Sequence, residues 1–254
     1  MTQIDQHAPV LTWTEPEGIA CRGTLVVVPG RGERPAHYER FGRRVAADGY
    51  RVHAAADPIA DSALTASQVS GLLTDPGTAG PRVLAGSDTG ALFAVGLAAT
   101  GQIPGLDALV LAGLPVAVAG PASGSWDQEL DARTACPAHR TRLSAPGLRR
   151  GALYEPVPDG WAERADLGAV SQPILGLHGT DDQVSPFPAV RARYAAATAA
   201  ELVGITGGRH DVLNDVTHRT VAATIVLFLE RLRLGAELPY IAIRERTHRA
   251  AEPV

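Results

Sequence analysis

Three short motifs in the sequence hold residues suited to nucleophilic or acid–base chemistry. They are Gly86-Ser87-Asp88-Thr89-Gly90, His178-Gly179-Thr180-Asp181-Asp182 and Gly207-Gly208-Arg209-His210-Asp211. A glycine-flanked nucleophile, then an acid, then a histidine is the chain order of one kind of catalytic triad. The motifs therefore predict a site in which a histidine works between two carboxylates.

The register of the first motif determines which residue occupies the reactive position. With Gly86 and Gly90 as the outer glycines, the pattern Gly-x-nucleophile-x-Gly places Asp88 at the sharp turn, and not Ser87. Small flanking residues are needed because such a turn has no room for side chains. Taken alone, the stretch also fits an ordinary glycine-rich turn, and the two downstream motifs favour the catalytic interpretation.

Composition limits the class of protein. The chain has 254 residues with 45% hydrophobic content, which suits one domain with an insertion. A net charge of -4 gives no reason to expect nucleic acid or a membrane surface as partner. Residues 1–10 lack the apolar core of a signal peptide, and Cys21 and Cys136 lie in different contexts, so we expect a cytoplasmic protein without a disulfide framework. The high alanine and glycine content suggests a bacterial source.

Strand and helix patterns alternate along the chain. The run Thr24-Leu25-Val26-Val27-Val28 is apolar without alternation, which is typical of a strand buried on both faces. The alternation favours an α/β fold with a mostly parallel sheet and helices on both faces. We expect strands at 24–28, 51–56, 108–112, 173–177 and 202–205, and helices that include 38–46, 62–73, 91–100, 187–197 and 216–234.

The alternation breaks between residues 114 and 167. This stretch is rich in Pro, Gly, Ser and Arg, and it holds Trp126, Tyr154 and Trp161. A disordered loop is the alternative, but long insertions in compact domains are usually functional lids. We therefore expect a core formed by 1–113 and 168–254 and an inserted cap over 114–167. The tail from 235 to 254 is expected to be solvated or to contact another copy of the chain.

Four segments resemble the α/β-hydrolase superfamily, and within it the monoacylglycerol lipase and lysophospholipase branch. They read Pro-Gly-Arg-Gly-Glu over 29–33, Leu-Ala-Gly-Ser-Asp-Thr-Gly over 84–90, His-Gly-Thr-Asp-Asp-Gln-Val-Ser-Pro over 178–186 and Gly-Arg-His-Asp-Val-Leu-Asn over 208–214. The resemblance covers nearly the whole chain and is weakest in the insertion. It implies the α/β-hydrolase fold, a small-molecule substrate and no cofactor.

The resemblance also assigns roles to single residues. Asp88 occupies the nucleophile position, His210 is the base, and Asp182 is the acid that orients the histidine. Asp181 is the less favoured choice for that acid.

An oxyanion hole is part of the same pattern. The backbone N–H groups of Arg31 and Thr89 would be its donors. Pro29 stands where the family usually has histidine, which affects the packing of this loop.

Asp88 is the main departure from the lipase pattern, because those enzymes have serine there. A carboxylate is already anionic at neutral pH and needs no base to activate it. It is a poor nucleophile toward an ester carbonyl, since the product is a labile anhydride, but a good one toward an epoxide or alkyl halide carbon. Epoxide hydrolases and haloalkane dehalogenases of this superfamily use an aspartate in this way. His210 would then activate water to hydrolyse the resulting ester.

The leaving group is not determined by the sequence. Epoxide opening needs acidic donors over the oxygen, and Tyr154 is the tyrosine that the insertion offers. Halide binding uses indole N–H groups, for which Trp126 and Trp161 are candidates. These three residues are the predicted substrate-binding side chains.

Three functions stay open at this point. The first is a hydrolase of a small hydrophobic ester-, thioester- or epoxide-like substrate, with Asp88 as nucleophile or as base. The second is a lyase or cyclase of natural-product metabolism on the same scaffold, and the third is a ligand-binding protein without catalysis. The sequence also leaves open an engineered serine-to-aspartate change at position 88.

Other polar residues are expected to be structural. No His, Cys, Asp or Glu cluster has metal-ligand spacing along the sequence, and no dinucleotide fingerprint is present. His178 is interpreted as a structural histidine at a strand end. Asp211, Asn214 and Asp215 are expected to cap the last long helix.

Overall fold

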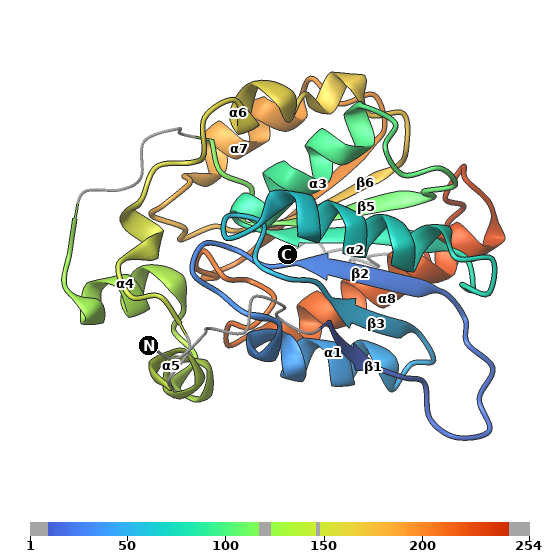
Figure 1. The fold of residues 1–254 in the computed structure, drawn as a ribbon, viewed down its shortest axis with the longest axis horizontal. Coiled ribbons are helices and arrows are strands. Elements are labelled where there is room, and N and C mark those ends of the chain that lie inside the picture. Colours follow the sequence, from blue (N-terminus) through green and yellow to red (C-terminus); the bar gives the residue numbers. More distant parts are fainter. Residues whose placement is uncertain (1–9, 117–122, 146–147, 244–254) are drawn as a thin grey trace, which may run out of the picture.

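The computed structural model describes residues 10–116, 123–145 and 148–243, and a seven-stranded sheet runs through this part of the chain (Figure 1). The strands lie in the order β1-β3-β2-β4-β5-β6-β7, with β1 antiparallel to β3 and the other neighbours parallel. Their bounds are β1 Leu11–Trp13, β2 Thr24–Val28, β3 Arg51–Ala54, β4 Arg82–Ser87, β5 Ala108–Ala112, β6 Ile174–Gly179 and β7 Ala200–Ile205.

Burial of the central strands follows from their composition. Every residue of β2 and β5 is buried, because these runs are apolar on both faces and helices cover both. Parallel strands end at the same edge of a sheet, so the loops that follow β2, β4, β6 and β7 meet there. Those loops hold the sequence motifs.

Helices pack on both faces of the sheet (Figure 1). On one face lie α1 (Glu39–Ala46), which follows the short turn η1 (Pro35–Tyr38), and α8 (His218–Leu234). On the other lie α2 (Ser62–Thr74), α3 (Thr89–Ala99) and α7 (Phe187–Tyr194). Two hydrophobic clusters result, one including Phe41, Val45, Ile225 and Phe228 and the other including Val69, Leu92, Val95 and Val190.

The predicted mostly parallel sheet with helices on both faces is confirmed. Strand β1 was not expected, because three residues at a sheet edge are too short to give a periodic pattern. It pairs through Leu11 with Ala54 of β3. The last helix begins at His218, two residues later than expected.

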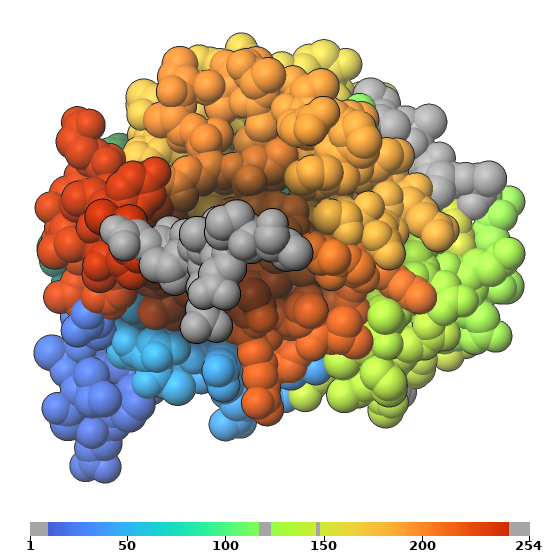
Figure 2. Space-filling view, turned by 180° about the vertical axis from the view of Figure 1, so that it is seen from behind, coloured from blue at the N-terminus to red at the C-terminus, as the bar shows by residue number. Residues whose placement is uncertain are grey.

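The inserted segment forms helices and helical turns beside the sheet. They are α4 (Trp126–Arg133), α5 (Pro137–Ser144), η2 (Ala152–Tyr154), α6 (Trp161–Arg164) and η3 (Leu167–Ala169). Helix α4 begins with a capping box between Ser125 and Gln128, and Pro137 starts α5. Seen from behind, the yellow-green atoms of α4 and α5 form a lobe at one side of the molecule (Figure 2). That this segment is a cap stays a prediction.

Cys21 and Cys136 are unpaired thiols. None of the helices in the described ranges has both the length and the apolar character needed to cross a lipid bilayer. Residues 1–9 and 244–254 lie outside the described residues, so the expectations for the N-terminus and for part of the tail are not addressed by the structure.

We expect Gly90→Ala to destabilise the fold. Gly90 packs against the loop after β2, and a Cβ at this position would lie 2.3 Å from the carbonyl oxygen of Val28. The backbone shift that this Cβ would force should lower the free energy of unfolding, measured by urea denaturation, by about 1–3 kcal/mol. The control is Gly71→Ala in α2, where a Cβ meets open space. This change should raise the free energy of unfolding by about 0.5–1 kcal/mol. Equal stability of the two variants would contradict the prediction.

Candidate functional site

Asp88 stands at a strained turn between β4 and α3. Its φ of 49° and ψ of -124° lie in a region that non-glycine residues rarely occupy. Gly86 and Gly90 make the turn possible, because a Cβ on Gly86 would lie 2.3 Å from the carbonyl oxygen of Gly90. The backbone N–H of Asp88 donates to Ala112 at 2.9 Å, which fixes the turn to β5. The predicted strand, sharp turn and helix are confirmed.

The structure brings the three motif residues together. His210 Nδ1 lies 2.8 Å from Asp182 Oδ2, and His210 Nε2 lies 3.1 Å from Asp88 Oδ1. All three side chains are buried, with residue exposures of 2% for Asp88 and His210 and 4% for Asp182. The imidazole therefore connects the two carboxylates in the order that the motifs predict.

The sequence predicted a role for the backbone of Arg31 but none for its side chain. Its backbone N–H, the expected oxyanion donor, points to Asp88 Oδ2 at 2.9 Å. Its side chain forms a bidentate ion pair with the same carboxylate. Nε lies 2.8 Å from Oδ2, and Nη2 lies 2.8 Å from Oδ1. Thr89, the other expected donor, is the first residue of α3, where N–H groups have no acceptor within the helix.

Both carboxylate oxygens of Asp182 have polar partners. Its Oδ1 accepts from the backbone N–H groups of Val184 at 2.8 Å and Ser185 at 3.0 Å. His178 Nε2 lies 2.9 Å from Oδ2, the oxygen that contacts His210. His178 also lies within 2.6 Å of the Ser185 carbonyl oxygen, so this strand-end histidine positions the acid. Burial opposes ionisation of Asp182, but the two histidines outweigh it and lower the pKa of this carboxyl.

Charges at the site stabilise one another. Burial disfavours the Asp88 carboxylate, but Arg31 and His210 outweigh this and hold the pKa of Asp88 well below its usual range. Burial alone would lower the pKa of His210, but the carboxylates of Asp182 and Asp88 raise it to about 10. At neutral pH the resting site therefore holds two cations and two anions, with His210 as an imidazolium.

The predicted substrate-binding side chains have other contacts in the structure. Trp161 packs on Phe93 with ring centroids 5.2 Å apart and lines a cavity of about 270 Å³ that faces α2 and α3. The Arg150 guanidinium lies over Trp126, with its Cζ atom 5.0 Å from the centroid of the Trp126 ring. The Tyr154 hydroxyl lies beside Gly124. Among the described contacts, none joins these three residues to Asp88 or His210, and their role in binding stays a prediction.

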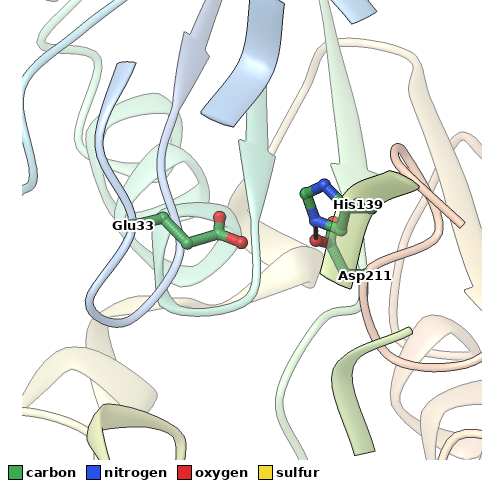
Figure 3. Close-up of side chains that lie close together, drawn as sticks. All are labelled: Glu33, His139 and Asp211. Carbon is green, nitrogen blue, oxygen red and sulfur yellow. Dashed lines mark hydrogen bonds and ion pairs between the residues drawn. The ribbon is translucent and has the colours of Figure 1, made fainter. Parts of the chain in front are cut away.

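A second buried cluster lies under the loop after β2, formed by Glu33, His139 and Asp211 (Figure 3). The side-chain atoms that could ligate a metal ion lie within 4.8 Å of one another, which is close enough for the three residues to bind one ion together. Each already has partners: Tyr38 donates to Glu33, His139 pairs with Asp211, and Arg133 Nη1 lies 3.8 Å from Glu33. Burial and the Asp211 carboxylate raise the pKa of Glu33 to about 7. We interpret the cluster as a buried hydrogen-bonded network, which sequence analysis missed because its residues are far apart along the chain.

The expectation that Asp211, Asn214 and Asp215 cap the last helix is wrong. Helix α8 begins at His218, and Thr217 occupies the N-cap position. Asp211 pairs with His139, and Asp215 instead accepts hydrogen bonds from the segment between α4 and α5 and from the third motif. These carboxylates join the insertion to the core, an arrangement that local sequence cannot predict.

Solved lipase and thioesterase structures have a similar fold. The chain is similar to Paleococcus ferrophilus monoacylglycerol lipase, with a TM-score of 0.67 and 19% identity over 87% of this chain and 97% of the other. It is also similar to a soluble variant of Saccharomyces cerevisiae monoglyceride lipase in complex with a substrate analog, with a TM-score of 0.71 and 15% identity over 87% and 91%. A thioesterase domain from the curacin biosynthetic pathway gives 0.57 and 18% over 89% and 94%.

These likenesses establish the α/β-hydrolase fold, which confirms the predicted fold class. The named neighbours are lipases and a thioesterase, and others are esterases. No protein-family model and no curated protein matches the sequence.

We expect Asp88→Asn to lower stability although it preserves shape. The change leaves the Arg31 guanidinium buried without its anion, and removal of one partner from a buried ion pair costs about 3 kcal/mol or more. It should also change the pH dependence. Because the pKa of His210 is raised to about 10, its contribution to stability is full below pH 6.5 and is lost as the pH rises toward 10. In the variant, that loss should still begin near pH 6.5, but it should be smaller and complete at a lower pH, because Asp88 no longer helps to raise the pKa of His210.

Urea denaturation between pH 6.5 and 10 measures both effects. Asp181→Asn is the matched control, since Asp181 adjoins Asp182 but is exposed, and its stability curve should follow that of the wild type. If Asp88→Asn instead matches the wild type at every pH, the buried ion pair does not exist in solution.

Proposed function

We propose that the protein is a hydrolase in which Asp88 attacks an electrophilic saturated carbon and forms an ester that water then cleaves. The observation that carries this proposal is the hydrogen bond of 2.9 Å from the Arg31 backbone N–H to Asp88 Oδ2. One oxygen of the carboxylate occupies the oxyanion hole, and the other, Oδ1, is the one beside His210.

Occupancy of the hole distinguishes two kinds of chemistry. An ester substrate attacked at its carbonyl needs the hole for its own oxygen, and Asp88 Oδ2 already fills that place. An ester formed on Asp88 keeps Oδ2 where it is, so the Arg31 N–H stabilises the oxyanion that develops when water attacks Cγ. The arrangement thus favours hydrolysis of the enzyme's own aspartyl ester.

The first half-reaction is a displacement. Asp88 Oδ1 forms a bond to the substrate carbon while the bond from that carbon to the leaving group breaks, and the leaving group departs with the electron pair. The carboxylate becomes a neutral ester. No base is needed in this step, because the pKa of Asp88 is far below neutral pH.

The second half-reaction uses His210. Esterification removes the Asp88 charge that helps to hold His210 protonated, so the pKa of the imidazole falls and it gives its proton to the departing anion or to solvent water. His210 then takes a proton from water as the water oxygen attacks Cγ of Asp88. Cleavage of the Cγ–Oδ1 bond releases the alcohol, which takes the proton from His210. Asp182 keeps the imidazole oriented throughout.

Hydrolysis of an ester or thioester, with Asp88 as a base toward water, is the second candidate. It is favoured by the neighbours, which are named as monoacylglycerol lipases and a thioesterase. The filled oxyanion hole argues against it. The cap assignment for 114–167 belongs to this proposal too, and it is supported by the 2.8 Å hydrogen bond from Arg31 Nη1 to the carbonyl oxygen of Glu155 in that segment.

Intact-protein mass spectrometry of His210→Gln tests the proposal. Without the imidazole, the first half-reaction proceeds and the second stops, so in a panel of epoxides, alkyl halides and short esters the reactive epoxides or halides should leave a stable adduct on Asp88 and the short esters should leave none. In the Asp88→Asn/His210→Gln double variant, the peptide that contains position 88 should remain unlabelled, and peptide mapping separates this result from labelling of the Cys21 and Cys136 thiols.

Other results would contradict the covalent mechanism. Turnover by the wild type with no adduct in His210→Gln would support Asp88 as a base. The absence of both turnover and adduct would favour the lyase, cyclase or ligand-binding alternative.

A further inference from the structure

We propose that the substrate carries a carboxylate next to its electrophilic carbon, and that Arg31 recognises this anion in exchange for Asp88. The inference rests on the proposed function and adds the substrate class. It assigns the Arg31 side chain, which the sequence pattern left without a role, as the group that selects and admits the substrate.

Arg31 blocks the resting site. Its side chain is among the largest fully buried ones in the described residues, and the residue is 2% exposed. The guanidinium binds both oxygens of Asp88, and Nη2 lies 2.8 Å from Oδ1, the oxygen that must attack. A substrate carbon cannot approach the lone pairs of Oδ1 along this side until the guanidinium moves.

Moving the guanidinium separates a buried ion pair. A neutral substrate would leave the Arg31 charge in a buried site without an anion, which is strongly unfavourable. A carboxylate on the substrate supplies a replacement, since it can accept the same two parallel N–H donors. Anionic compounds are therefore the class that can open the site at low cost.

The same geometry positions the reacting carbon. The guanidinium starts in hydrogen-bond contact with Oδ1, and the Arg31 backbone N–H stays bound to Oδ2, so a short displacement of the side chain leaves its bound carboxylate beside Asp88. The carbon bonded to that carboxylate is then the one nearest Oδ1. The structure thus points to acids with a leaving group on the carbon adjacent to the carboxylate.

The cap is connected to this exchange. Arg31 Nη1 donates to the Glu155 carbonyl oxygen at 2.8 Å, and Arg133 of α4 donates to the Arg31 carbonyl oxygen at 2.8 Å. The second contact holds the backbone, so the oxyanion N–H can stay in place while the side chain changes partner.

Bromoacetate and bromoacetamide form a matched pair for the test. They share the leaving group and nearly the same size, and they differ in charge. The His210→Gln protein is incubated with each, and labelling is mapped by peptide mass spectrometry, which separates Asp88 from the thiols of Cys21 and Cys136. In water, charge repulsion disfavours attack of a carboxylate on bromoacetate, so a preference for it must come from the site.

We expect Asp88 to be labelled by bromoacetate about 100-fold faster than by bromoacetamide, because only the anion compensates Arg31. In Arg31→Met/His210→Gln the preference should disappear or reverse. Glycolate should slow labelling by bromoacetate in the His210→Gln protein, whereas glycolamide should not. This competition does not depend on folding of the Arg31 variant.

The outcomes separate the two proposals. Labelling of Asp88 at similar rates by both reagents, or faster by bromoacetamide, would leave the proposed function standing and overturn the inference. Protection by glycolamide equal to that by glycolate would also overturn it. No label on Asp88 from either reagent in folded protein would contradict the proposed function and, with it, the inference.

Discussion

The ion pair between Arg31 and Asp88 is the interaction on which the site depends. The carboxylate at this turn is buried, and burial alone would raise its pKa. The guanidinium fork and the Arg31 N–H supply three hydrogen bonds within 2.9 Å, which keep the carboxylate ionised and fix its orientation. Because Arg31 follows β2 and Asp88 follows β4, the pair also ties together two neighbouring strands at the edge where the motifs meet.

Charge balance connects the two halves of the proposed reaction. In the resting site, Arg31 and His210 are cations and Asp88 and Asp182 are anions. Alkylation removes one anion, and the site responds by releasing a proton from His210, which turns the imidazole into the base that the next step requires. A serine at position 88 would not create this sequence, because its alkoxide forms only with the help of the histidine.

The sequence predicted the fold and the proximity of Asp88, Asp182 and His210 because both depend on local patterns. Alternating strands and helices specify a parallel sheet, and the spacing of Gly86 and Gly90 selects Asp88 over Ser87. The side chain of Arg31 was not predictable, since its direction depends on a carboxylate 57 residues away. The same holds for His139 and Asp211, which meet only when the insertion folds onto the core. β1 was missed because its pairing with β3 involves only three residues.

Isotope labelling of Asp88 tests the covalent mechanism most directly. The wild-type protein is allowed many turnovers in oxygen-18 water, with the panel compound that alkylates His210→Gln fastest, and the peptide containing Asp88 is then weighed. The mechanism predicts that the Asp88 carboxylate gains heavy oxygen, since water attacks Cγ and Oδ1 leaves with the alcohol. Heavy oxygen in the product together with ordinary oxygen in Asp88 would contradict it and assign Asp88 as a base.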